Sequence, residues 1–198
     1  MINFLSDKLV NWLTKRKAIQ NSEATLYRYA AYNCLYTFIP VIPILSIAYA
    51  LNSISGGILF FIAFILLRKY TGGFHFQSPG LCLFVSLLSE FLFILLAKVF
   101  PSIFLWSVLF FISSISLCIL SPVESAKRDL SLADRCRCQK QTKKILVSIC
   151  LFCYLLYWIG KKDLITYPAS AVLMTAISQY PAIILEKRKN NLDLHSDS

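Results

Sequence analysis

The longest charge-free run of the sequence covers residues 29–67, where no Asp, Glu, Lys or Arg occurs. A helix needs roughly 20 apolar residues to cross a bilayer, so this run is long enough for two spans. The sequence NSISGG at residues 52–57 is expected to form the turn between them. Further apolar runs cover residues 81–97, 99–123, 145–160 and 164–185. Because 57% of the residues are hydrophobic and only 15% are charged, we predict an all-α, polytopic integral membrane protein with about six transmembrane helices.

The N-terminal segment has dispersed apolar residues at helical spacing. These residues are Ile2, Leu5, Leu9, Trp12 and Leu13. With polar residues between them and a basic cluster behind, they predict an amphipathic interfacial helix within residues 1–22. An ordinary soluble helix packed on the rest of the protein is the alternative. The dispersed pattern does not resemble a cleavable signal peptide, so we expect the segment to be retained.

Basic residues are concentrated in alternate connections between the predicted spans. With a cytoplasmic N-terminus, 17 of the 20 Lys and Arg residues fall in inside segments and 3 in outside segments. This bias obeys the positive-inside rule and predicts that both termini are cytoplasmic. The net charge of +10 is then mostly a topology signal, and nucleic acid is not an expected partner. We expect one membrane-embedded domain over residues 1–198, with transmembrane helices in 29–185 and a flexible cytoplasmic tail at 186–198.

Two potentially reactive residues, His75 and Cys82, lie in and just after a short polar break between two apolar runs. Ser78 can cap a helix and Pro79 suits a first helical position, so the next span is predicted to begin at Pro79. Cys82 then lies in the first turn, where the positive end of the helix dipole favours a thiolate.

The loop before this helix supplies a possible base for the thiol. Gly72 and Gly73 free the loop to fold back over the helix start. The His75 imidazole can then take the Cys82 proton and return it to a leaving amine. Backbone N–H groups can hold an oxyanion, and Arg68 adds positive charge nearby. The alternative is that His75 is a surface residue without a catalytic role.

Glu90 and the other cysteines are also candidates for functional or metal-binding sites. Glu90 lies two turns beyond Cys82, so we expect an interhelical hydrogen bond or a position near the far interface rather than contact with His75. Cys136 and Cys138 lack companion ligands, so neither a metal nor a cofactor is expected. Cysteines at the cytoplasmic side should be reduced. Small core residues are expected within the apolar runs at Cys34, Cys118, Cys150 and Cys153.

The polar break resembles the signature of the AgrB family, accessory gene regulator protein B, in a set of five residues: Arg68, Gly72, Gly73, His75 and Cys82. The plan of the chain is similar too, with an amphipathic N-terminus, a hydrophobic hairpin and a later basic loop that opens with the sequence SPVE at 121–124. The resemblance covers nearly the whole chain, while its specific motifs are confined to residues 68–82 and 121–128.

This resemblance implies a thiol protease of the bacterial cell membrane that processes a short AgrD-like propeptide at the cytoplasmic face. It implies that Cys82 is the nucleophile and His75 the base. Supporting residues would be Arg68, Gly72, Gly73 and, from the helix start, Ser78. The cysteine forms a thioester with the propeptide, and an internal Cys or Ser of the propeptide then closes a thiolactone or lactone ring for quorum sensing. A homodimer in the lipid bilayer is also implied.

Two other classes of protein remain open from the residues alone. One is a small membrane transporter or peptide exporter without proteolytic activity, with Glu90 and the broken span near Pro40 and Pro43 lining a path. The absence of an internal repeat and the single intramembrane charge argue against it. The other is a non-catalytic membrane partner.

Overall fold

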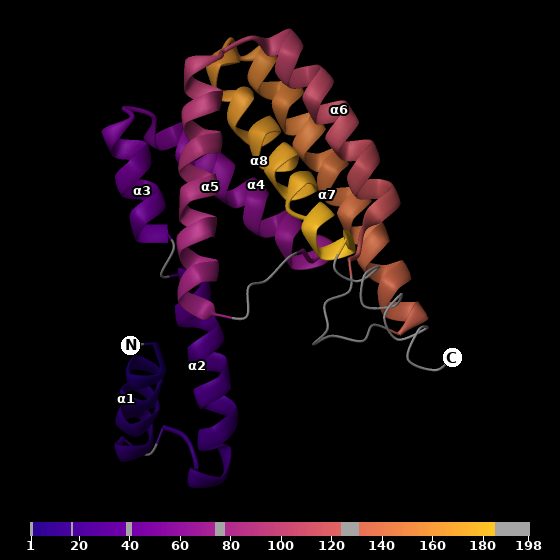
Figure 1. The fold of residues 1–198 in the computed structure, drawn as a ribbon. Coiled ribbons are helices and arrows are strands. Elements are labelled where there is room, and N and C mark those ends of the chain that lie inside the picture. Colours follow the sequence, from indigo (N-terminus) through magenta and orange to yellow (C-terminus); the bar gives the residue numbers. More distant parts are fainter. Residues whose placement is uncertain (1, 17, 39–40, 74–77, 124–130, 185–198) are drawn as a thin grey trace. The chain divides into compact units, whose positions relative to one another are not determined.

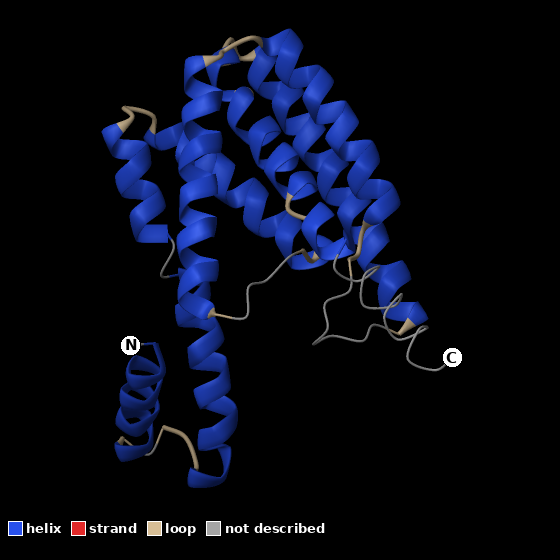
Figure 2. Cartoon of the chain, in the orientation of Figure 1, coloured by secondary structure: helices blue, strands red, loops and turns tan. Residues whose placement is uncertain are grey.

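The computed structural model describes residues 2–16, 18–38, 41–73, 78–123 and 131–184. Within these ranges the chain is helical and contains no strand, which confirms the predicted all-α class (Figure 1) (Figure 2). The elements are α1 (Ile2–Lys15), η1 (Asn21–Glu23), α2 (Ala24–Phe38), α3 (Val41–Ala50), α4 (Ile54–Thr71), α5 (Pro79–Val99), α6 (Ile103–Leu120), α7 (Leu132–Trp158), η2 (Lys162–Leu164) and α8 (Thr166–Ile177). The predicted tail at 186–198 lies outside the described residues.

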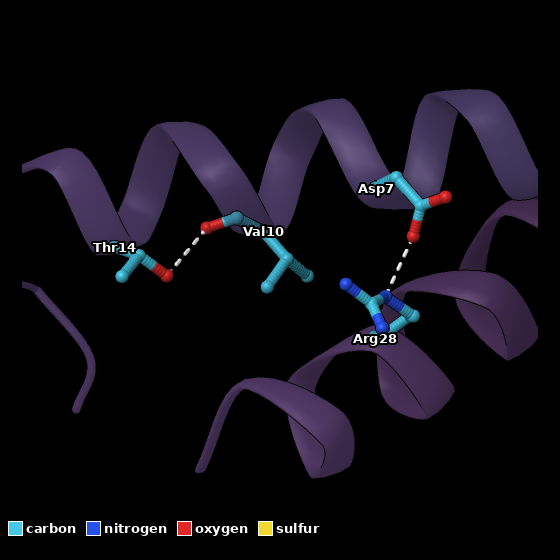
Figure 3. Close-up of polar contacts among 4 residues, drawn as sticks. All are labelled: Asp7, Val10, Thr14 and Arg28. Atoms are coloured by element: carbon cyan, nitrogen blue, oxygen red, sulfur yellow. Dashed lines mark hydrogen bonds and ion pairs between the residues drawn. The ribbon is translucent and has the colours of Figure 1, made fainter. Parts of the chain in front are cut away.

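The chain divides into two compact units, Met1–Ser46 and Ile47–Ser198. In the first unit α1 packs against α2 through a buried cluster of Val10, Ile19 and Ala31. An ion pair joins Asp7 Oδ1 to Arg28 Nε at 2.6 Å (Figure 3). Both side chains are about half exposed, so the pair is worth less than about 1 kcal/mol and the apolar cluster carries the packing.

The other face of α1 is apolar and exposed. Leu5, Leu9 and Trp12 follow one another at helical spacing and are 40%, 47% and 53% exposed. The segment therefore forms a helix with one packed face and one open apolar face, and its location at a bilayer interface stays a prediction.

Three helices of the second unit are long and apolar enough to cross a membrane among the residues described, namely Ile54–Thr71, Gly80–Val99 and Ile103–Leu120. The apolar runs 81–97 and 99–123 form separate helices, because α5 ends at Val99 and α6 begins at Ile103. The apolar helix α3 has only ten residues. The count of six spans therefore stays a prediction.

Helix α8 forms the core of this unit. It packs against α4, α5 and α6, and ten of its twelve residues are buried. A helix of this length extends only about 18 Å, which is shorter than the hydrocarbon core. The run 164–185, predicted as one span, is thus interrupted in its described part, where the short central helix is followed by a turn at residues 178–179 and by helical residues 180–184. Its small residues allow the neighbouring helices to approach closely.

The turn predicted at residues 52–57 is wrong in its last four residues, because α4 already begins at Ile54. The two glycines serve close packing instead. A Cβ at Gly56 would lie 2.5 Å from the Tyr167 ring, and a Cβ at Gly57 would overlap the Ala48 side chain.

The basic loop expected between the apolar runs 99–123 and 145–160 is also wrong over its second part. Residues 132–158 form the single helix α7. Its start is fixed by Ser131, whose Oγ accepts from the Asp134 N–H at 3.2 Å and donates to Asp134 Oδ2 at 2.7 Å. This cap, together with long unbranched side chains that favour helix, extends the helix beyond the apolar run.

Candidate functional site

Cys82 lies in the first turn of α5, as predicted. Ser78 occupies the N-cap position with an extended backbone, and Pro79 is the first helical residue. The Cys82 N–H donates to the Ser78 carbonyl oxygen at 3.0 Å, and the Cys82 residue is 8% exposed. The predicted side-chain cap is wrong, because the exposed Ser78 makes no capping hydrogen bond. Pro79 already fixes the backbone of this turn and removes one N–H donor.

His75 belongs to residues 74–77, which lie outside the described residues. The distance from its imidazole to the Cys82 thiol therefore stays a prediction. Both ends of the connection that carries it are described, and the N-terminal end is held by a set of specific contacts.

Residues 68–73, the Arg68 turn, end α4. Arg68 Nη1 donates to the Gly72 carbonyl oxygen at 3.0 Å and to Ser178 Oγ at 2.9 Å. Gly72 has φ 69° and ψ −154°, a conformation that is essentially restricted to glycine. A Cβ at Gly72 would lie 2.6 Å from the Val123 carbonyl oxygen, and one at Gly73 would overlap the Arg68 guanidinium. The structure thus gives a physical reason for arginine and two glycines at this spacing.

The Arg68 turn also contacts the second motif segment. Gly72 forms an isolated parallel bridge with Val123, and the Val123 N–H donates to the Thr71 carbonyl oxygen at 3.1 Å. Residues 71–72 and 123, which belong to the motif segments 68–82 and 121–128, are therefore in contact.

A third segment completes this arrangement and was missed from the sequence. Gln179 is fully buried in the turn that ends α8, and its Nε2 donates to the Thr71 carbonyl oxygen at 3.0 Å and to Ser121 Oγ at 2.7 Å. A polar residue within the apolar run 164–185 was a signal that could have marked Gln179, although nothing in the sequence indicates its partners.

Glu90 lies on the buried face of α5 and is 2% exposed. Its Oε2 has no hydrogen-bond partner in the described part of the chain, so the expected interhelical hydrogen bond is not made at this atom. About two helical turns, or about 12 Å of rise, separate it from Cys82 along α5.

The remaining candidate features lie elsewhere. All seven cysteines fall within the described residues and form no disulfide. The described part of the chain contains no group of three or more His, Cys, Asp or Glu residues that could hold a metal ion. A cavity of about 290 Å³ lies between α6 and α7, with Trp106, Phe110 and Tyr154 among its lining residues. It also contacts the first residues of α8, at the end of that helix away from Gln179.

Comparison with known proteins gives one match. The family described as Accessory gene regulator B matches residues 6–180, which is most of the chain. No curated protein and no solved structure matches. The match gives this membrane protein a role in the agr quorum-sensing system, and the family implies an AgrD-like propeptide as substrate. On the extent of that match, the chain belongs to the accessory gene regulator B family.

Proposed function

We propose that this protein is a membrane cysteine endopeptidase and cyclase, with Cys82 as nucleophile and His75 as base. The observation that carries the proposal is the position of Cys82 in the first turn of α5, next in the chain to the anchored Arg68 turn. Helix-start N–H groups at this position are suited to stabilise an oxyanion. The family supplies the substrate class, an AgrD-like propeptide.

The first half of the reaction is an acylation. His75 takes the proton of the Cys82 thiol, and the sulfur attacks the carbonyl carbon of the peptide bond before the propeptide's C-terminal tail. The tetrahedral oxyanion collapses, the C–N bond breaks, and His75 returns the proton to the leaving amine. The products are a Cys82 thioester and the released tail.

The second half is ring closure. A thiol or hydroxyl within the propeptide loses its proton to His75 and attacks the thioester carbonyl. The C–S bond to Cys82 breaks, the cysteine recovers its proton, and a thiolactone or lactone is released. A thioester retains acyl-transfer energy, so cyclisation competes with hydrolysis where water is excluded. We propose that the site lies at the cytoplasmic face of the membrane and that the protein is a homodimer.

The intermediate provides the direct test. In a propeptide whose ring-forming Cys or Ser is replaced by Ala, acylation proceeds while ring closure is blocked. Mass spectrometry of the full-length protein should then find the N-terminal propeptide fragment attached to Cys82, in a bond that hydroxylamine cleaves. Released tail with no adduct on Cys82 would contradict a covalent mechanism.

We propose that a basic face of α7 binds the substrate, through an acidic tail on the propeptide. Arg137, Lys140 and Lys144 are exposed and lie at spacings of three and four residues. Replacing all three by Gln should raise KM about three- to tenfold in low salt and change it little in high salt, because salt screens exposed charges. Initial cleavage rates measured against propeptide concentration check this prediction.

The control is Lys161→Gln with Lys162→Gln, which removes exposed cations between α7 and α8. This pair should leave KM unchanged. Equal effects of the two sets of substitutions, or none in low salt, would argue against substrate recognition by α7.

A further inference from the structure

The amide of Gln179 has only one orientation that fits its contacts. Its side chain is fully buried, and Nε2 lies 3.0 Å from the Thr71 carbonyl oxygen and 2.7 Å from Ser121 Oγ. A carbonyl oxygen can only accept, so the NH₂ group must face Thr71. Gln179 Oε1 finds no partner among the described residues. An unpaired buried oxygen costs free energy, so the oxygen of this amide does not stabilise the fold. The two hydrogen bonds that the NH₂ group donates are therefore the reason for an amide at this position.

These two hydrogen bonds connect segments that are far apart in the sequence. Gln179 is 108 positions from Thr71 and 58 positions from Ser121. The Thr71 carbonyl oxygen accepts a second hydrogen bond from the Val123 N–H at 3.1 Å. Gln179 therefore holds both partners of the pairing between the Arg68 turn and residues 121–123.

The neighbouring residue holds the same turn at a second point. Ser178 Oγ accepts from Arg68 Nη1 at 2.9 Å and donates to the Thr175 carbonyl oxygen at 2.8 Å. Consecutive residues at the end of α8 thus fix the side chain of Arg68 and the backbone of Thr71. These contacts therefore join the turn to α8, the buried core helix of the unit.

We infer that Gln179 is a positioning residue for acyl transfer at Cys82. By holding the Thr71 carbonyl oxygen and Ser121, it fixes the point from which the chain leaves α4 for the start of α5. The inference rests on the proposed function. It predicts that losing the amide slows the chemical step while substrate binding, which involves other surfaces, is little changed.

The test compares variants of the full-length protein in proteoliposomes with its cognate AgrD-like propeptide. Gln179→Met keeps the side-chain length and removes both donors. We expect kcat to fall about 10- to 30-fold with KM within about twofold of the parent value. The matched control is Thr175→Val, which is equally buried on α8 and whose Oγ1 bonds to the Ala171 carbonyl oxygen of its own helix. That variant should keep kcat within about twofold, since it removes no contact to the turn.

The contact itself is tested by Ser121→Ala, alone and combined with Gln179→Met. Ser121→Ala removes one acceptor of Gln179 without altering α8, so it also tests the inference if Gln179→Met fails to fold. We expect it to lower kcat about three- to tenfold, and to have a smaller effect in the Gln179→Met background, because residues in one hydrogen-bond network are not additive. Backbone hydrogen exchange at Val123 should accelerate in Gln179→Met and stay unchanged in Thr175→Val.

The outcomes separate two failures. Unchanged kcat and unchanged exchange at Val123 in folded Gln179→Met, with Cys82→Ala inactive, would overturn the positioning role alone. Cleavage by Cys82→Ala would overturn the proposed function. Equal losses of kcat in Gln179→Met and Thr175→Val would also overturn the inference, because the effect would then be general destabilisation of α8.

Discussion

Cys82→Ala should abolish propeptide cleavage, with a loss of at least about 10⁴-fold in kcat, because no other group takes over covalent attack when the nucleophile is removed. Cys82 is 8% exposed, and alanine is a small apolar residue that suits the first turn of a helix, so the variant is expected to fold. Cys82→Ser should retain only a trace of cleavage, since a hydroxyl is a poorer nucleophile in a site adapted to a thiol. Quantitative mass spectrometry of the released C-terminal tail measures both effects.

The matched control for this result is Cys118→Ala. Cys118 lies in α6 in the second unit, and removing it should leave cleavage unchanged at equal membrane abundance. His75→Ala should reduce kcat nearly as far as Cys82→Ala, because general base and nucleophile act as one unit. Full cleavage by Cys82→Ala, or a comparable loss in Cys118→Ala, would eliminate Cys82 as the nucleophile.

Local sequence signals predicted the surroundings of Cys82 well. Ser78 and Pro79 predicted where α5 begins, and this placed Cys82 in its first turn. Pro101 lies in the break that separates α5 from α6. These features depend on neighbouring residues and on backbone restrictions, which a single sequence contains.

Predictions failed where a residue type has two structural uses. Glycines 56 and 57 were expected in a turn, yet they lie in α4 and allow close packing against Tyr167 and Ala48. The basic residues within 135–144 were expected in a loop, yet Ser131 caps a helix that includes them. Charge sets on which side of a bilayer a segment lies, whereas it does not prevent that segment from being helical.

The contacts around the Arg68 turn could not be predicted from sequence at all. Arginine and the two glycines were identified as supporting residues. However, Ser178, which accepts from Arg68, and Gln179, which donates to Thr71, each lie more than 100 positions from their partners. Such pairs are set by how α4, α6 and α8 pack together, and their residue types have no characteristic spacing. The position of His75 relative to Cys82 remains a prediction.

Gly72→Ala should have the largest effect outside the proposed catalytic pair, a loss of at least about 100-fold in cleavage, through backbone geometry rather than chemistry. At φ 69° and ψ −154° a non-glycine residue costs about 1–3 kcal/mol. The new Cβ would lie 2.6 Å from the Val123 carbonyl oxygen, which is backbone and cannot rotate away. The pairing of Thr71 with Val123 should therefore break, and the turn should lose its fixed position next to α5. Cleavage assays at matched membrane levels measure this loss.

Two other glycines separate the causes of that loss. Gly160 also has a positive φ, 79°, but a Cβ there meets nothing within 4 Å. Gly160→Ala should therefore lower the free energy of unfolding by about 1 kcal/mol and leave cleavage unchanged, because it introduces backbone strain but no steric clash. Gly80 lies two residues before Cys82 in α5, with open space around its Cβ position, so Gly80→Ala should be neutral or slightly stabilising. If Gly72→Ala behaved like Gly160→Ala, strain alone would explain it, and the contact with Val123 would have no part in positioning the site. A loss confined to Gly72→Ala would instead show that the pairing of residues 71–73 with 121–123 is what cleavage requires.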